Sequence, residues 1–213
     1  MGRRIRDLVA SVATMGLVAA ISGFVGAGSA QAAADVTYSS QTLRYECSYP
    51  VIGFDYLDVQ IEFKAPDSVP ANSQFMPYDI VATATVPQNV VELLYYVAGI
   101  DGVRGTADGS VDLTNGSPGT VDIGDLSVAE QFIPDPPADF PVIAEQVGST
   151  VVPTITAGSP GVLSANMGDY FAASLDFHYY NATPEWQGPE TFECFLDTTS
   201  PQNTAFSPNM TVS

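Results

Sequence analysis

Apolar and polar residues alternate one by one along two segments of this chain, residues 57–64 and 171–180. A period of two is typical of a strand with one face buried and the other in water, because successive side chains point to opposite faces of a sheet. The apolar positions are Leu57, Val59, Ile61 and Phe63 in the first segment, and Phe171, Ala173, Leu175, Phe177 and Tyr179 in the second. Antiparallel β-structure is therefore the expected framework.

Shorter β-favouring runs predict further strands, and proline- and glycine-rich turns separate them at 115–119, 134–137 and 158–161. The runs cover residues 43–47, 80–86, 103–113, 121–126, 151–156, 191–196 and 205–212. About nine strands at this spacing predict an all-β fold, an antiparallel sandwich. No repeat of fixed period is visible, so we expect a single domain.

One segment has helical periodicity, and one is irregular. After Pro87, apolar residues recur at helical spacing, with Asn89 placed to cap the start and Gly99 to end a short helix. The proline-rich segment from Phe132 to Pro141 predicts a long crossover between the two halves of the sandwich.

The N-terminus has the pattern of a secretory signal peptide. Arg3, Arg4 and Arg6 precede an apolar stretch that ends in small residues at 30–34. Cleavage after Ala32 or after Ala34 fits, and an uncleaved anchor is the alternative. We predict that residues 1–34 are removed and that 35–213 form one β-sandwich domain. The protein is then secreted, either released or held at the cell envelope.

The net charge of −18 limits the partners. Beyond the signal, the fixed cations are Arg44, Lys64 and Arg104. Nucleic acids and anionic lipid surfaces are bound through clustered Lys and Arg, so we expect no nucleic-acid partner and no membrane insertion after signal cleavage. A protein or a cell-wall polysaccharide remains possible as a partner, and the oligomeric state stays open.

Two cysteines, Cys47 and Cys194, are present in the whole chain. In an exported protein two cysteines most simply form one disulfide. Metal binding by these thiols is disfavoured, since neither has a Cys or His neighbour at ligand spacing.

Several segments resemble a secreted actinobacterial family classified as a domain of unknown function. They are Leu43-Arg44-Tyr45-Glu46-Cys47-Ser48-Tyr49-Pro50, Ala65-Pro66-Asp67-Ser68-Val69-Pro70, Ala82-Thr83-Ala84-Thr85-Val86-Pro87, Gly99 to Gly105 and Phe192-Glu193-Cys194. The resemblance covers most of residues 40–212. It implies an exported immunoglobulin-like β-sandwich with a Cys47–Cys194 disulfide, and it brings no activity, cofactor or catalytic residue.

One strand face carries the three residue types of a nucleophile triad, at Ser174, Asp176 and His178. At about 3.3 Å per residue, the Cα atoms of Ser174 and His178 would lie roughly 13 Å apart. A nucleophile and its base must approach to about 3 Å. Asp135 and Asp139 could form a carboxylate pair but are also favoured turn residues. We therefore predict no catalytic residue and no enzymatic activity.

The acids near the 115–119 turn could hold calcium through oxygen ligands, although turn formation explains the same residues. They are Asp108, Asp112, Asp122 and Asp125, and Asn115 could add an amide oxygen. We predict no metal site and no cofactor.

Aromatic residues provide the candidate ligand face, formed by Tyr170, His178, Tyr180 and Trp186. The alternative is that a loop carrying Trp186 covers this face. The preferred hypothesis is a noncatalytic binding or structural module with an unknown ligand. A carbohydrate-binding module or weak hydrolase is one alternative, and a secreted inhibitor or adhesin acting through the 132–141 loop is another.

Overall fold

The computed structural model describes residues 34–213, so the expected signal peptide lies, except for Ala34, outside the described residues. Removal of the signal peptide stays a prediction, and so does the division of the chain into a signal peptide and one domain. The described chain is almost entirely β-structure. Its elements are β1 (Asp35–Ser39), β2 (Leu43–Tyr49), β3 (Gly53–Pro66), β4 (Ser68–Val69), β5 (Gln74–Phe75), β6 (Tyr78–Val86), α1 (Gln88–Leu93), the π-helical turn η1 (Leu94–Ala98), β7 (Ile100–Thr114), β8 (Gly116–Ser117), β9 (Thr120–Phe132), β10 (Phe140–Glu145), β11 (Ile155–Ala157), β12 (Gly161–Tyr179), β13 (Trp186–Leu196) and β14 (Met210–Val212).

The main sheet closes on itself. Its hydrogen-bonded pairing runs through β2, β3, β6, β10, β9, β7, β12 and β13 and then returns to β2. All of these pairings are antiparallel. β13 pairs with β12 along one edge and with β2 along the other. The eight strands therefore form a closed ring without an unpaired edge strand.

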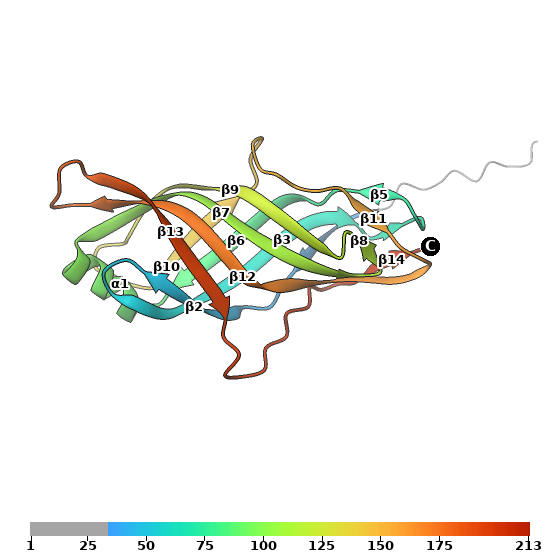
Figure 1. Ribbon diagram of the computed structural model, residues 1–213, viewed down its shortest axis with the longest axis horizontal. Helices are drawn as coiled ribbons and strands as arrows, with labels where there is room; N and C mark the ends of the chain where they lie inside the picture. Colours follow the sequence, from blue (N-terminus) through green and yellow to red (C-terminus); the bar gives the residue numbers. More distant parts are fainter. Residues whose placement is uncertain (1–33) are drawn as a thin grey trace, which may run out of the picture. The chain divides into compact units, whose positions relative to one another are not determined.

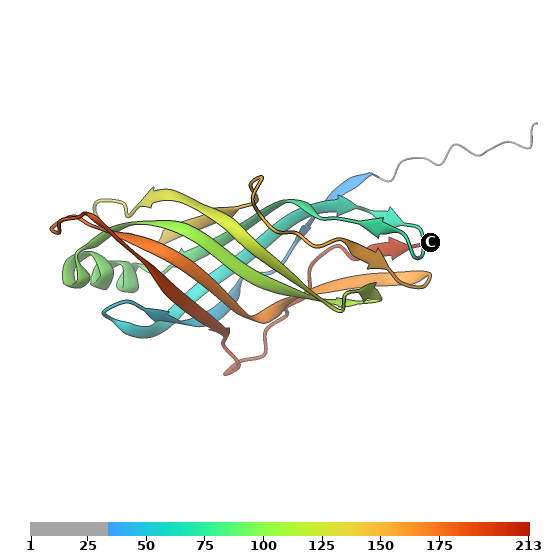
Figure 2. The ribbon, with the colours of Figure 1, turned by 45° about the horizontal axis from the view of Figure 1, so that its top comes forward.

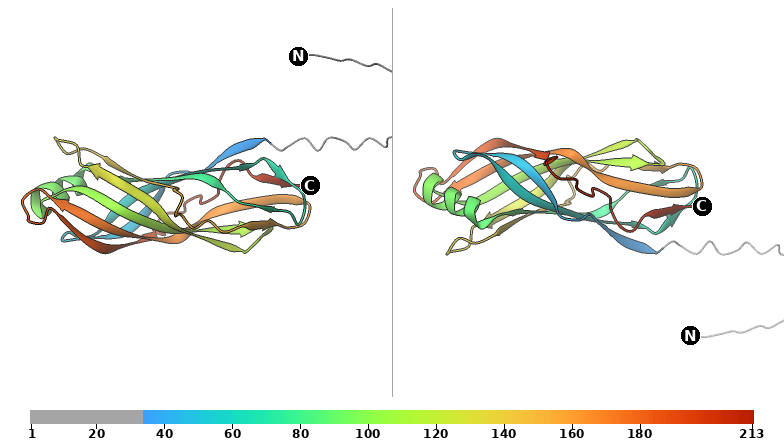
Figure 3. Two further views of the ribbon diagram at one scale, coloured as in Figure 1. Left: turned by 90° about the horizontal axis from the view of Figure 1, so that it is seen from above. Right: turned by 90° about the horizontal axis from the view of Figure 1, so that it is seen from below.

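The closed sheet has two layers that share one interior. In Figure 1, β9, β7, β12 and β13 lie in front of β3, β6 and β10, and Figure 2 shows the same arrangement after a turn of 45°. The views in Figure 3 place α1 at one end of the layers and β14 with the C-terminus at the other. This arrangement confirms the predicted all-β antiparallel sandwich with one short helix.

Period-two alternation accounts for the burial of the long strands. On β3, Leu57 and Val59 are buried, whereas Asp58 and Gln60 are exposed. Inward-facing side chains from both layers form one hydrophobic core. A smaller core lies at the β14 end, where β14 pairs with β12 and, in parallel, with β4; it contains Tyr38, Ala65, Val69, Ala157, Leu163, Met210 and Val212.

The predicted helix is present, but its start differs from the expectation. It begins at Gln88, so the prediction that Asn89 caps it is wrong: Asn89 lies in the first turn. Asp139 supplies the acceptor instead, since its Oδ1 takes the backbone N–H of Gln88 at 2.8 Å. Gly99 ends the helical segment in the left-handed conformation, as predicted, with φ of 75°.

The proline-rich segment joins two neighbouring strands. Residues 133–139 connect β9 to β10, its antiparallel neighbour in the closed sheet, so no strand is crossed over. The Gln131 side chain extends the pairing at the mouth of this loop, because it donates to the Ile143 carbonyl and accepts from the Ile143 N–H, each at 2.9 Å. The long crossover that the prolines suggested is a wide hairpin connection.

Two expected strands are much shorter than predicted. Of residues 151–156, only 155 and 156 belong to a strand, β11, and of 205–212 only 210–212 do, as β14. Isolated bridges at Val151, Ala205 and Ser207 are the remaining pairings. Within residues 34–213, no helix is long and apolar enough to cross a membrane.

Candidate functional site

Three aromatic side chains, two of them from the predicted ligand face, meet across four strands. Phe132 on β9, His178 on β12 and Trp186 on β13 lie in one cross-strand row, with Gly102 of β7 between the first two. The ring centroids are 5.3 Å apart for Phe132 and His178 and 5.0 Å for His178 and Trp186. A Cβ at position 102 would lie 2.9 Å from the Phe132 ring, so glycine there lets the two rings meet. We call these three residues the aromatic row.

Two carboxylates contact the ring nitrogens of His178 in the aromatic row. His178 Nδ1 contacts the Asp101 carboxylate, and its Nε2 lies 3.4 Å from Glu185 Oε2. The hydrogen bond to Asp101 is the main reason why the pKa of His178 is raised above its usual value, and Glu185 adds to the effect. Both ring nitrogens are therefore engaged by carboxylates of the same chain.

Arg104 covers the indole ring. Its guanidinium carbon lies 4.3 Å from the centre of the Trp186 ring, a cation–π geometry. The same side chain pairs with Asp176 at 3.3 Å and with Glu130 at 3.6 Å. Flat sugar rings bind to open aromatic faces, and this face of Trp186 is occupied by a side chain of the protein itself.

The three triad-type residues have separate partners. Asp176 pairs with Arg104, and His178 pairs with Asp101 and Glu185. Ser174 lies opposite Thr106 and Thr191 in the sheet, four residues before His178. The strand keeps the serine and the histidine apart, as the rise per residue requires.

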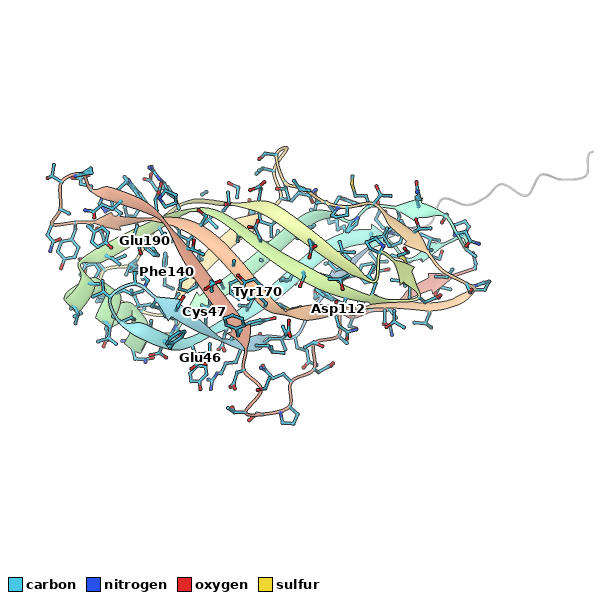
Figure 4. The ribbon with its side chains drawn as sticks, viewed as in Figure 1. Glu46, Cys47, Asp112, Phe140, Tyr170 and Glu190 are labelled. Atoms are coloured by element: carbon cyan, nitrogen blue, oxygen red, sulfur yellow. A yellow bond between two sulfur atoms is a disulfide. The ribbon has the colours of Figure 1, made fainter. Side chains whose placement is uncertain are left out.

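The structure brings together only two of the four residues of the predicted ligand face. His178 and Trp186 touch, but Tyr180 packs on Tyr95 and donates to the Tyr95 carbonyl at 3.2 Å. Tyr170 lies eight residues before His178 on β12, about 26 Å along the strand. Tyr170, which Figure 4 shows partway along β12, packs on Phe195. Its hydroxyl donates to Glu193 at 3.1 Å.

Three of the five residues considered for calcium form local hydrogen bonds through their side chains. Asp108 Oδ1 accepts the Asp125 N–H at 2.8 Å, and Asp112 Oδ1 accepts the Thr120 hydroxyl at 2.7 Å. The Asn115 amide donates to the Ser159 carbonyl at 2.8 Å. Among residues 34–213, no three His, Cys, Asp or Glu side chains are grouped as metal ligands.

An apolar cavity of about 130 Å³ lies inside the closed sheet. Aliphatic and aromatic side chains from both layers line it, including Leu57, Val59, Leu126, Val128, Leu175 and Phe177. Along β12 the lining extends from Met167 to Phe177, which corresponds to about 30 Å of strand. We call this interior cavity the channel.

The sequence analysis did not predict the channel, although small residues at inward-facing strand positions indicated free space in the interior. Five alanines line the cavity where longer aliphatic side chains would fill it: Ala82, Ala84, Ala107, Ala144 and Ala173. Alternation shows which residues face inward, but it does not show whether the opposite layer fills the remaining space.

Polar groups gather at one place on the channel wall, a break in the pairing of β7 and β12. Residues 168–170 of β12 stand opposite the single residue Ser110 of β7. Tyr45 of β2 is buried, and its hydroxyl donates to the Gly168 carbonyl at 2.7 Å. Burial raises the pKa of Tyr45, which keeps the hydroxyl protonated as a donor.

Comparison with known proteins gives a family and no activity. A model described as a family of unknown function (DUF6801) matches residues 44–207, well over half of the chain. No curated protein and no solved structure matches the chain. The protein therefore belongs to this family of unknown function, DUF6801.

Proposed function

We propose that this protein is an exported, noncatalytic binding module of the cell envelope or the extracellular space that holds a small apolar molecule in its interior channel. The observation that carries this proposal is the cavity of about 130 Å³ lined by aliphatic and aromatic side chains. An apolar cavity of this order stays dry and takes up small hydrocarbons, because water gains too few hydrogen bonds there.

The state of the reactive side chains supports a noncatalytic role. Cys47 and Cys194 are joined in a disulfide, so neither thiol serves as a nucleophile. His178 is held between Asp101 and Glu185. Binding by the closed sheet requires no cofactor.

The disulfide also supports export, since such bonds persist in oxidising compartments. The N-terminal signal pattern and the resemblance to a secreted actinobacterial family belong to the same proposal. Within it, the module is either released or bound to the wall, and a protein or cell-wall polysaccharide serves as its macromolecular partner. The strongly acidic composition supports the exclusion of nucleic acid.

The first test is thermal unfolding in buffer saturated with n-hexane, compared with hexane-free buffer. A molecule that binds only the folded state stabilises it, so hexane should raise Tm. Ala144→Leu places three extra carbons in the channel, because Ala144 is buried and lines it. This variant should lose the response to hexane, whereas the matched variant Ala129→Leu, at an exposed position on β9, should keep it.

If Ala144→Leu does not fold, Ala173→Leu tests the same space from β12. Unchanged Tm of the wild-type protein in hexane, with no heat in a calorimetric titration, would refute an interior binding site.

A further inference from the structure

The loop between β12 and β13, residues 180–185, is joined to the sheet through the side chain of His178. On one side of the imidazole, Nδ1 contacts the Asp101 carboxylate of β7. On the other side, Nε2 lies 3.4 Å from Oε2 of Glu185, the last residue of the loop. Figures 1 and 2 show this loop at the end of the layers where α1 lies. His178 therefore bridges two carboxylates that come from different elements. We call residues 180–185 the β12–β13 loop.

The protonation state of His178 decides whether both carboxylates are held. An ionised carboxylate only accepts hydrogen bonds, and a neutral imidazole has one N–H, whereas an imidazolium has two. Protonated His178 therefore donates to Asp101 and to Glu185 at once. Neutral His178 keeps one of these hydrogen bonds and turns the lone pair of its other nitrogen toward the second carboxylate, which makes that contact repulsive.

Asp101 is the carboxylate that neutral His178 retains. The Asp101 side chain is 22% exposed, whereas that of Glu185 is 70% exposed, so water screens the interaction with Glu185 more strongly. The hydrogen bond to Asp101 is also the largest cause of the raised pKa of His178. Loss of the proton therefore releases Glu185 and leaves Asp101 in place.

The other charged side chains beside His178 are paired with one another. Arg104 of β7 pairs with Asp176 of β12 at 3.3 Å and with Glu130 of β9 at 3.6 Å. The contacts of His178 with β9 and β13 are made by the uncharged rings of the aromatic row. Histidine is the side chain that titrates nearest to neutral pH, and the chain has one. A change of charge in this cluster near neutral pH therefore belongs to His178.

The two ends of the β12–β13 loop are anchored differently. At its start, Tyr180 donates its N–H to the Gly99 carbonyl and its hydroxyl to the Tyr95 carbonyl, each at 3.2 Å. At its end, the Glu185 carbonyl accepts the N–H of the last residue of β12 at 2.7 Å, and the Glu185 carboxylate contacts His178. The residues between these anchors are mostly exposed. Loss of the carboxylate contact therefore loosens the β13 end of the loop and leaves its start attached.

We propose that His178 is a pH-dependent clasp, which holds the β12–β13 loop through Glu185 when it is protonated and releases the loop when it is neutral. The folded pKa of His178 is raised above the usual value of about 6.5. The clasp is therefore closed below about pH 6.5 and opens as the pH rises through the folded pKa. This inference concerns one end of the fold and does not depend on a molecule in the channel.

Electron paramagnetic resonance of a nitroxide label on the loop tests the clasp. Thr183→Cys provides the label site, because Thr183 is exposed in the middle of the loop. Between about pH 5 and pH 9, we expect the label to change from slower to faster motion, with a midpoint equal to the pKa of His178 measured by NMR. A label at Thr198→Cys, an exposed position between β13 and β14, controls for effects of pH on the nitroxide and should show no transition.

Removal of the loop carboxylate separates the clasp from other pH effects. In Glu185→Ala, the label should move fast at every pH, and the pKa of His178 should fall, because Glu185 helps to raise it. Glu190→Ala removes the same charge from another exposed position, on β13, and is the matched control. In this variant, the label should keep its slow motion at low pH and its transition at the pKa of His178.

Three results would overturn the clasp. The first is label motion that stays constant while His178 titrates in the wild-type background. The second is a transition of the opposite sign, with slower motion at high pH. The third is a transition that persists unchanged in Glu185→Ala, because release would then act through another contact.

Discussion

Cys47 and Cys194 face each other directly across β2 and β13, with their Cα atoms 4.1 Å apart and both residues fully buried. Their disulfide joins the two strands whose pairing closes the sheet. It therefore connects positions 147 residues apart in the sequence at the edge where the first and last long strands of the closed sheet meet.

Replacing both cysteines, as Cys47→Ala with Cys194→Ala, should lower the free energy of unfolding by about 2–5 kcal/mol, because a long loop is no longer closed in the unfolded chain. Urea denaturation measures the change. Wild-type protein unfolded in reductant is the control and should match the double variant. Equal stability of oxidised wild type and double variant would contradict the expectation.

Tyr45→Phe should destabilise the fold by about 1–3 kcal/mol, because the buried Gly168 carbonyl loses its hydroxyl donor. Tyr56→Phe on β3 is the matched control, since Tyr56 is only partly buried. Chemical denaturation of both variants gives the comparison. A loss for Tyr45→Phe no larger than for the control would show that this buried hydrogen bond contributes little.

Gly105→Ala should cost about 2 kcal/mol or more, because a Cβ there would lie 2.1 Å from the Ser174 carbonyl oxygen and the residue has φ of 147°. Gly119→Ala adds the same methyl group where no atom lies within 4 Å. Thermal melts of the two variants should therefore differ clearly. Similar Tm values would mean that β7 can shift away from β12 at little cost.

His178, the single histidine of the chain, should titrate above the usual value of about 6.5 in NMR. Since its folded pKa is raised, its stabilising contribution is complete below pH 6.5 and is lost as the pH rises through the folded pKa. Asp101→Asn removes the main cause and should lower the pKa and weaken this pH dependence. A pKa at or below 6.5 in the wild type would refute the Asp101 interaction in solution.

Arg104→Lys should change the fluorescence of Trp186, the single tryptophan, because a lysine keeps the charge but does not cover the ring with a planar group. We expect emission at longer wavelength, from a more hydrated indole, with a stability loss below about 1 kcal/mol. Arg44→Lys is the control, because the Arg44 side chain lies over Tyr56 and not over tryptophan. An unchanged spectrum would mean that Arg104 does not stack on the indole in solution.

Local patterns were sufficient for the class of structure. Alternation on β3 and β12, the turn residues between strands and the Gly99 helix end all reflect interactions within a few residues. They failed where a distant residue decided the outcome. Asp139, from another segment, replaced Asn89 as the acceptor at the helix start, and the pairing of β9 with β10 turned an expected crossover into a wide hairpin.

In the candidate site, too, the sequence predicted some residues, and contacts between distant segments decided the rest. The sequence identified His178 and Trp186, but not Asp101, Arg104 or Phe132, which contact them from β7 and β9. Tyr170 and Tyr180 are also aromatic, but they pack on Phe195 and Tyr95, and the four-residue ligand face stays a prediction.

The sequence by itself determined that the chain forms an antiparallel β-fold and that two cysteines are available to bridge its ends, because side-chain alternation and cysteine content are properties of the chain. Only the tertiary structure decided that β13 pairs on both sides to close the sheet, and that a channel remains within it. The reason is physical: alternation sets which face of a strand is buried, whereas strand neighbours and the space between layers depend on contacts between residues far apart in the chain.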